Sequence, residues 1–287
     1  MEKKLIGFGV LSGAIAGLFM FAFARIFAEP VIQRAIDYES GRDAAQQALD
    51  KAAGLPMTPE GHELFSRTVQ GDIGSGAALV LFGVATGALF AVAYCVCIGR
   101  TGRVRPRPLA LLVAAAGFVS FYLVPFMKYP ANPPAVGHEE TIGDRSALYL
   151  LVLACSVLFM FLAVYVGQRL AVRWDSTWNA SVVCGLAHLV LMGIVFLILP
   201  PFGHLHANVA EYGKHATETP LPLTDDHGTI VFPGFPADVL AQFRAYSVAA
   251  QLILWGLIGL IFAPLADRVL SPSKPTAAAG ERVPAGA

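Results

Sequence analysis

The stretch LYLLVLACSVLFMFLAVYV, residues 148–166, decides the fold, because it has the length of a membrane-spanning helix and carries no charged side chain. A helix needs about 20 mainly apolar residues to cross the roughly 30 Å of hydrocarbon in a bilayer. A soluble core does not require an unbroken apolar run of that length. The stretch therefore predicts a transmembrane helix.

Five further stretches of the chain have the same character. Hydrophobic residues make up 56% of the 287 residues and charged residues 14%, and the mean hydropathy is +0.62. These values are typical of a membrane protein. We predict an all-α fold, a polytopic transmembrane helix bundle of about six spans, at residues 5–28, 73–98, 109–127, 147–168, 177–199 and 245–265.

Lys and Arg gather in the connections on one side of these spans. Cytoplasmic loops retain positive charge, so we predict that the N-terminus and the C-terminus are both inside. Residues 1–270 would form a single transmembrane domain with outer loops 29–72, 128–146 and 200–244, and residues 271–287 a disordered cytoplasmic tail. The basic residues that set this orientation are Lys3, Lys4, Arg100, Arg103, Arg105, Arg107, Arg169, Arg173, Arg268, Lys274 and Arg282.

The first span also has features of a signal peptide. Lys3 and Lys4 precede an apolar run, and Ile26, Phe27 and Ala28 follow before Glu29. That run is long for a signal peptide, and Arg25 lies within it. We expect residues 1–28 to be retained as a span; cleavage would leave five spans.

Composition and motifs exclude several classes of function. The only basic cluster is an inner connection, so the predicted surroundings are membrane lipid and no nucleic acid. No cysteine lies in an outer loop, which indicates no disulfide framework. There is no Gly-x4-Gly-Lys-Ser/Thr loop, so ATP hydrolysis would have to come from another chain. With no nucleophile–base pair evident, we predict no enzyme and no permanently bound cofactor.

Six of the seven histidines lie in the predicted outer connections. Four of them, His204, His206, His215 and His227, lie among acids in residues 203–228. Imidazole and carboxylate suit borderline divalent ions such as cobalt and nickel. This segment is therefore predicted to collect metal ions; the alternative is a flexible loop that binds nothing tightly.

The seventh histidine, His188, falls near the middle of a predicted span. Ionisable groups at that depth are costly and mark functional sites. Cys184 lies one turn before it and Met192 one turn after it, so the three side chains share a helix face. They are predicted to bind metal as a soft step in an ion path. The alternative is a histidine bonded to a backbone carbonyl, with Cys and Met as packing residues.

The stretch from Pro125 to Pro134 is too rich in proline to be helical. Irregular backbone near a membrane persists only where protein or water satisfies its polar groups. This stretch is therefore predicted either to dip between helices and line an entrance, or to form an ordinary surface turn.

An arginine precedes each span that runs from outside to inside: Arg67, Arg145 and Arg244. They either line a polar vestibule, or they anchor in headgroups or pair with Glu29, Asp72, Glu140 or Asp238. The candidate entrance or structural polar residues are Glu29, Arg67, Gln70, Lys128, Tyr129, Asn132, Glu140, Arg145, Asp238, Arg244 and Gln251.

Four segments resemble the CbtA family of proposed cobalt transporter subunits, over most of residues 5–270. They are KYPANPPAVGHEETIGDRSALYL (128–150), FPADVLAQFRAYSVAAQLILW (235–255), AEPVIQRAI (28–36) and SRTVQGDIG (66–74). The resemblance implies a bacterial inner-membrane subunit of a cobalt uptake system, linked to vitamin B12 synthesis. It also implies a partner, a small single-span subunit with a histidine-rich tail. The insertion at 203–228 departs from the family's compact fifth connection, which leaves open whether this chain relies on that partner.

The predicted function is uptake of a divalent metal cation, with cobalt(II) favoured as the substrate. Residues alone do not separate cobalt from nickel, copper or zinc, which bind the same ligands. The entrance arginines argue against an open cation funnel, because fixed positive charge repels the substrate. The alternative is a membrane assembly or partner-docking subunit that does not itself conduct ions.

Overall fold

The computed structural model describes residues 1–55, 69–102, 104–213 and 217–270. Six helical stretches in this part of the chain are long and apolar enough to cross a membrane, which confirms the predicted all-α bundle. The elements are α1 (Glu2–Phe23), η1 (Ala24–Ala28), α2 (Glu29–Ala52), η2 (Val69–Gly74), α3 (Ser75–Cys97), α4 (Pro106–Gly117), η3 (Phe118–Leu123), α5 (Val124–Lys128), η4 (Glu139–Thr141), α6 (Ile142–Trp174), α7 (Thr177–Ile198), η5 (Phe202–His204), α8 (His206–Tyr212), β1 (Leu223–Thr224), β2 (Ile230–Phe232) and α9 (Ala237–Leu270).

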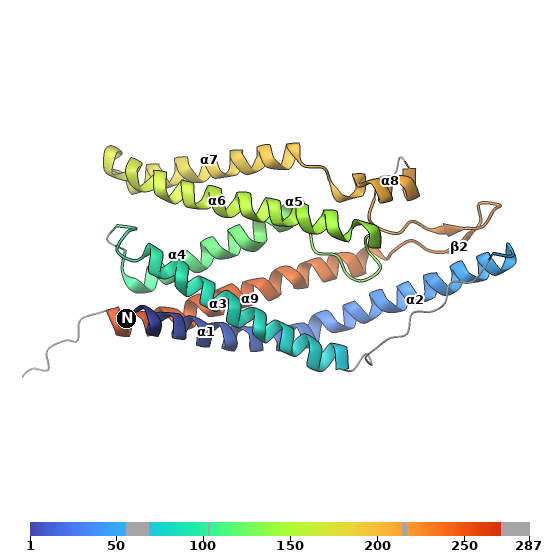
Figure 1. Cartoon of the computed structure of the whole chain (residues 1–287), viewed down its shortest axis with the longest axis horizontal. Coiled ribbons are helices and arrows are strands. Elements are labelled where there is room, and N and C mark those ends of the chain that lie inside the picture. Colours follow the sequence, from blue (N-terminus) through green and yellow to red (C-terminus); the bar gives the residue numbers. More distant parts are fainter. Residues whose placement is uncertain (56–68, 103, 214–216, 271–287) are drawn as a thin grey trace, which may run out of the picture.

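The long helices form two groups (Figure 1). Helices α1, α3, α4 and α9 surround one apolar core, whose largest buried side chains include Phe90, Tyr94 and Phe262. Helices α6 and α7 form a hairpin beside this group, and η3 and α5 pack against α6. A second cluster that includes Val152 and Met192 fills that junction.

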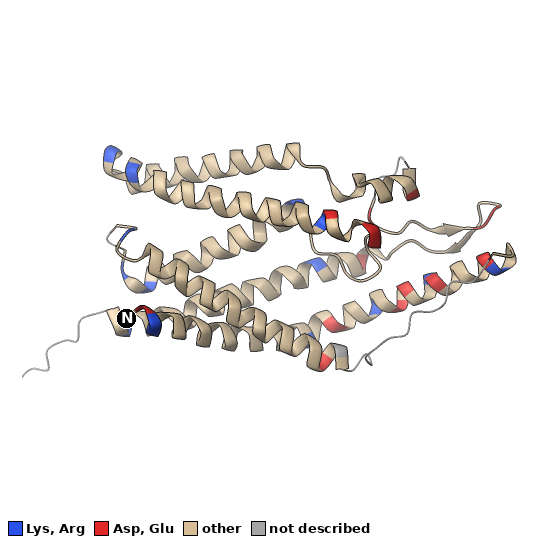
Figure 2. Ribbon diagram, viewed as in Figure 1, with Lys and Arg blue, Asp and Glu red and all other residues tan. Residues whose placement is uncertain are grey.

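The two ends of the bundle differ in charge (Figure 2). Lys and Arg lie near the N-terminus, in the connection after α3 and in the last turns of α6, at the end where α9 also finishes. Acidic residues concentrate at the opposite end, on α2 and on the longer connections. This segregation has the form that the predicted orientation requires.

The first helix extends far beyond its span. The first predicted span ended at residue 28, but α2 continues α1 through the π-helical turn η1 as far as Ala52. The 24 residues of α2 span about 36 Å, so α2 projects well outside a bilayer. It lies against the outer connections, where Val31, Ala35 and Tyr38 are buried.

Two helical stretches continue through a proline just after a π-helical turn, although the sequence predicted that the stretch beginning at Pro125 is not helical. A proline in a helix clashes with the carbonyl four residues before it. The π-helical turns η1 and η3 directly precede the helices that hold Pro30 and Pro125, and a wider turn gives the ring room. The third span therefore stays helical to Lys128, and irregular backbone begins only at Tyr129.

Helices α1 and α3 touch backbone to backbone. Gly9, Gly13 and Gly17 face Gly83 and Gly87, and a Cβ added at any of these positions would overlap the other helix. Small residues four apart allow such close approach in lipid, where burial of apolar surface does not drive helices together.

We expect Gly13→Ala to destabilise the protein by about 1–3 kcal/mol, because the new methyl group meets the backbone of Gly83, which cannot move aside. Gly7→Ala, on the same helix, is the matched control, since no atom lies within 4 Å of its added Cβ. Thermal unfolding in detergent micelles measures both. Equal melting temperatures for the two variants would contradict close glycine packing.

Candidate functional site

The buried face of α7 carries the three predicted soft ligands. Cys184, His188 and Met192 are all buried there, together with Ala180. This face meets α6, where Cys184 lies beside Gly167 and Met192 belongs to the same cluster as Val152. The helical spacing therefore brings the three side chains to one interface.

His188 is buried without a hydrogen bond. Its side chain is 6% exposed, and neither ring nitrogen has a partner among the described residues. The Phe159 carbonyl of α6 is near the ring without satisfying hydrogen-bond geometry. Ser156, fully buried on α6, likewise has an unpartnered hydroxyl. An unpaired buried polar group costs about 1–3 kcal/mol, which is unusual for a purely structural side chain.

The α7 face is not a closed metal site. Within the described ranges, no three His, Cys, Asp or Glu side chains are grouped closely enough to hold a metal ion. A metal ion at His188 would need further donors, which backbone carbonyls, water or another chain can supply. The interface suits passing contact with an ion better than permanent binding.

Outside the membrane-spanning core, Glu218 joins two of the predicted entrance arginines. Its carboxylate accepts a hydrogen bond from the Asn132 amide at 2.9 Å and lies 3.8 Å from the Arg145 guanidinium. Arg244 donates to the Asn132 side-chain oxygen at 2.8 Å. Burial raises the pKa of Glu218 above its ordinary value, while Asn132, Arg145 and Arg244 act in the opposite direction. We call these four residues the Glu218 network.

Lys128 and Tyr129 serve the end of α7. The Lys128 ammonium donates to the carbonyls of Phe196 and Leu199 at 2.7 and 2.8 Å, and the Tyr129 hydroxyl donates to the Pro200 carbonyl. The last carbonyls of a helix lack internal partners and carry partial negative charge, which a cation stabilises. Both residues therefore fix α5 to α7.

The other entrance candidates are dispersed. The Glu29 carboxylate lies against Gly71, Gln251 is half-buried on α9, and Glu140 is exposed. Arg34, which the prediction omitted, pairs with Asp238 at 3.3 Å. Arg25 pairs with Asp72 at 2.5 Å. Two of the predicted residues, Arg67 and His215, lie outside the described residues, as does the side chain of Gln70.

The histidines of the insertion do not converge in the part of the chain that the structure describes. His204, His206 and His227 are exposed and belong to no group of potential ligands. The segment nevertheless has a defined structure around them: α8 buries Asn208 completely, and Glu218 belongs to the network above.

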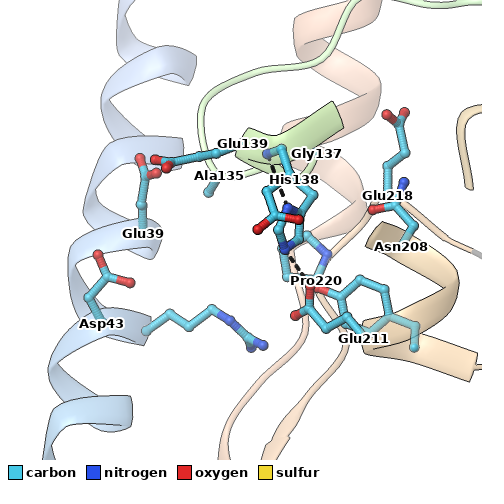
Figure 3. A pocket seen from close by; sticks show the side chains of 13 residues that line it. Glu39, Asp43, Ala135, Gly137, His138, Glu139, Asn208, Glu211, Glu218 and Pro220 are labelled. Atoms are coloured by element: carbon cyan, nitrogen blue, oxygen red, sulfur yellow. Dashed lines mark hydrogen bonds and ion pairs between the residues drawn. The ribbon is translucent and has the colours of Figure 1, made fainter. Parts of the chain in front are cut away.

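The outer connections enclose an acidic cavity of about 390 Å³ (Figure 3). We call it the outer cavity. Residues from α2, η4, α8 and the segment after α8 line it, with Arg42 and His138 as its basic groups. Its acidic side chains are Glu39, Asp43, Glu139, Glu140, Glu211 and Glu218. Of these, the sequence prediction named only Glu140 as a site residue.

A second cavity, of about 620 Å³, lies between the α5 region and α6. Tyr122, Tyr149 and Phe202 line it together with Asn132 and Arg145. Glu218 lines the outer cavity, whereas its partners Asn132 and Arg145 line the second one. The Glu218 network therefore forms part of the wall between the two cavities.

This arrangement defines a multi-helix membrane protein. Its notable polar groups are the lining of the outer cavity, the Glu218 network between the two cavities, and the buried side chain of His188. The chain belongs to the family described as Probable cobalt transporter subunit (CbtA), whose model matches residues 2–267. The resemblance found in the sequence is thereby confirmed. No curated protein and no solved structure matches the chain.

We expect a double-mutant cycle of Arg145→Gln and Glu218→Gln to give a coupling energy of about 1–3 kcal/mol. These side chains are only 21% and 13% exposed, so water screens the pair weakly. Arg34 and Asp238, exposed by 44% and 63%, form the control pair, with an expected coupling below about 1 kcal/mol.

Unfolding of the purified protein in mixed micelles measures both couplings. The Arg145–Glu218 coupling should fall as the pH drops through the raised pKa of Glu218, because a protonated carboxyl group cannot form the ion pair. Equal coupling energies for the two pairs would contradict the prediction that the Arg145–Glu218 pair is buried and weakly screened.

Proposed function

We propose that this protein is the membrane subunit of a cobalt uptake system in the bacterial inner membrane, and that it supplies cobalt for vitamin B12 synthesis. Membership of the CbtA family, whose model covers residues 2–267, carries the proposal. The basic end of the bundle faces the cytoplasm, which puts the outer cavity on the side where an imported ion arrives.

The proposed route has three stages. A cation first meets the acids of the outer cavity, then passes the Glu218 network into the second cavity, and then crosses along the α6–α7 interface at His188. Tyr129 and Tyr149 support the last step, because they line the second cavity and pack in the same cluster as Met192.

The proposed partner is a small single-span subunit with a histidine-rich tail. The incomplete ligand set at His188 favours a partner, since the missing donors must come from elsewhere. The α6–α7 hairpin offers a surface for a single span. In the most apolar 18-residue segments of its two helices, only 11% (α6) and 17% (α7) of the residues are buried within this chain. The face of α7 that is turned away from the bundle includes Leu189 and Val190, which are more than half exposed.

A second candidate function is docking or assembly without ion conduction. Two observations favour it: no three potential metal ligands are grouped in the described residues, and Arg145 and Arg244 are bound to neighbouring residues. In this case the partner would carry the ion.

We expect His188→Leu to lower the initial rate of radiolabelled cobalt uptake at least about tenfold, because the substitution removes the polar group at mid-span while keeping an apolar volume. Leu89→Ala, at an exposed position of α3 outside the α6–α7 hairpin, is the control and should transport as the wild type does.

Uptake is measured in proteoliposomes with this chain alone and again with the partner subunit, using nickel and zinc as competitors. Cobalt accumulation with the wild type that persists in a folded His188→Leu variant would contradict the route. Absence of uptake under both conditions would favour the docking function.

A further inference from the structure

The outer cavity contains more negative charge than it neutralises. Arg42 is the one arginine among its lining residues in the described part of the chain, and that guanidinium donates to the Leu221 carbonyl at 2.8 Å. Figure 3 shows the carboxylates of Glu39 and Asp43 on α2 and of Glu139 on η4 on one side, with Glu211 on α8 opposite them. Glu39 is repelled by both Asp43 and Glu139. Such a cluster attracts cations but does not by itself define a site.

Asn208 supplies an independent observation. It lines the cavity, its side chain is completely buried, and its Nδ2 donates to the Phe202 carbonyl at 2.8 Å. A carbonyl accepts only from a donor, so this bond fixes which end of the amide is nitrogen. The Oδ1 atom is left without a partner among the described residues. A buried amide oxygen in that state needs a donor or a cation.

His138 acts on the site through Glu211. Its Nδ1 accepts a hydrogen bond from the Glu140 backbone N–H at 3.2 Å, so a neutral ring carries its proton on Nε2. That Nε2 lies 3.6 Å from the Glu211 carboxylate. With Nε2 protonated, the ring N–H lies near Glu211 and the ring has no lone pair for a metal ion. His138 is therefore a positioning residue, and the available donors are oxygen atoms.

The cavity is too wide for protein ligands alone to complete a coordination shell. No three of its carboxylates and imidazole are grouped closely enough to ligate one ion, while its volume of about 390 Å³ holds an ion together with several waters. Oxygen donors with retained water are typical of weak, exchangeable binding of divalent ions.

We propose that the outer cavity binds one partly hydrated divalent cation, with the Glu211 carboxylate and the Asn208 Oδ1 atom as its protein ligands. The remaining acids hold the ion by charge through water. An all-oxygen site discriminates poorly between cobalt, manganese and other divalent ions. Its role as the capture site of uptake rests on the proposed function, whereas binding itself does not.

The test is a titration of the purified full-length protein in nanodiscs with Mn²⁺, followed by the loss of the free-ion electron paramagnetic resonance signal. We expect one Mn²⁺ per chain, displaced by Co²⁺. Glu211→Gln and Asn208→Ala should each weaken binding about 10-fold or more. Asp226→Asn, an exposed acid in the β1–β2 turn outside the cavity, is the matched control and should leave the affinity unchanged.

Glu211 is 41% exposed and its substitution is isosteric, so Glu211→Gln keeps the test valid if Asn208→Ala lowers folding yield. Unchanged Mn²⁺ affinity in Glu211→Gln overturns the proposal. So does an equal loss in Asp226→Asn, which would indicate a diffuse surface potential. Cobalt uptake is measured in parallel. Site-specific Mn²⁺ binding without cobalt uptake supports this inference and contradicts the proposed function. Cobalt uptake together with wild-type Mn²⁺ affinity in Glu211→Gln supports the proposed function and contradicts this inference.

Discussion

The backbone contact between α1 and α3 is the constraint on which the rest of the molecule depends. In lipid no hydrophobic driving force brings two helices together, so their association depends on close packing. The glycines at positions 9, 13, 17, 83 and 87 permit that close packing. Because α2 continues α1 through η1, fixing α1 in the bundle also fixes the projecting helix outside it. One wall of the outer cavity is thus rigidly continuous with a membrane helix.

The outer connections are bonded to each other and to α2, so they form a single cap. The Gly137 N–H donates to the Glu218 carbonyl at 3.0 Å, the Tyr38 hydroxyl donates to the Pro233 carbonyl at 3.0 Å, and Arg42 holds the Leu221 carbonyl. The insertion that the sequence marked as unusual is built into this cap. That explains why it contributes a completely buried Asn208 and a mostly buried Glu218, while His204, His206 and His227 lie at the surface.

The sequence predicted what depends on local pattern. Apolar length gave the six spans, and helical spacing placed Cys184, His188 and Met192 on one buried face. The passage through Pro30 and Pro125 was not predictable, because it requires π-helical turns that no residue pattern marks. The outer cavity was missed for a different reason: its acids come from α2, η4 and α8, which only the tertiary fold brings together. One alternative paired the three arginines with acids that included Glu140, but the acidic partner of Arg145 is Glu218, 73 positions away.

Two of the arginines near the proposed entrance have partners. Arg145 and Arg244 are bound within the Glu218 network, and Lys128 donates to the α7 carbonyls, so part of their positive charge is offset. A transport path must bind its ion strongly enough to admit it and weakly enough to release it. The proposed route, with oxygen donors and retained water in the outer cavity and an incomplete nitrogen and sulfur set at His188, would meet that requirement. Discrimination on this route would belong to the His188 face, because imidazole and thioether prefer transition metals over the harder ions that oxygen donors also attract.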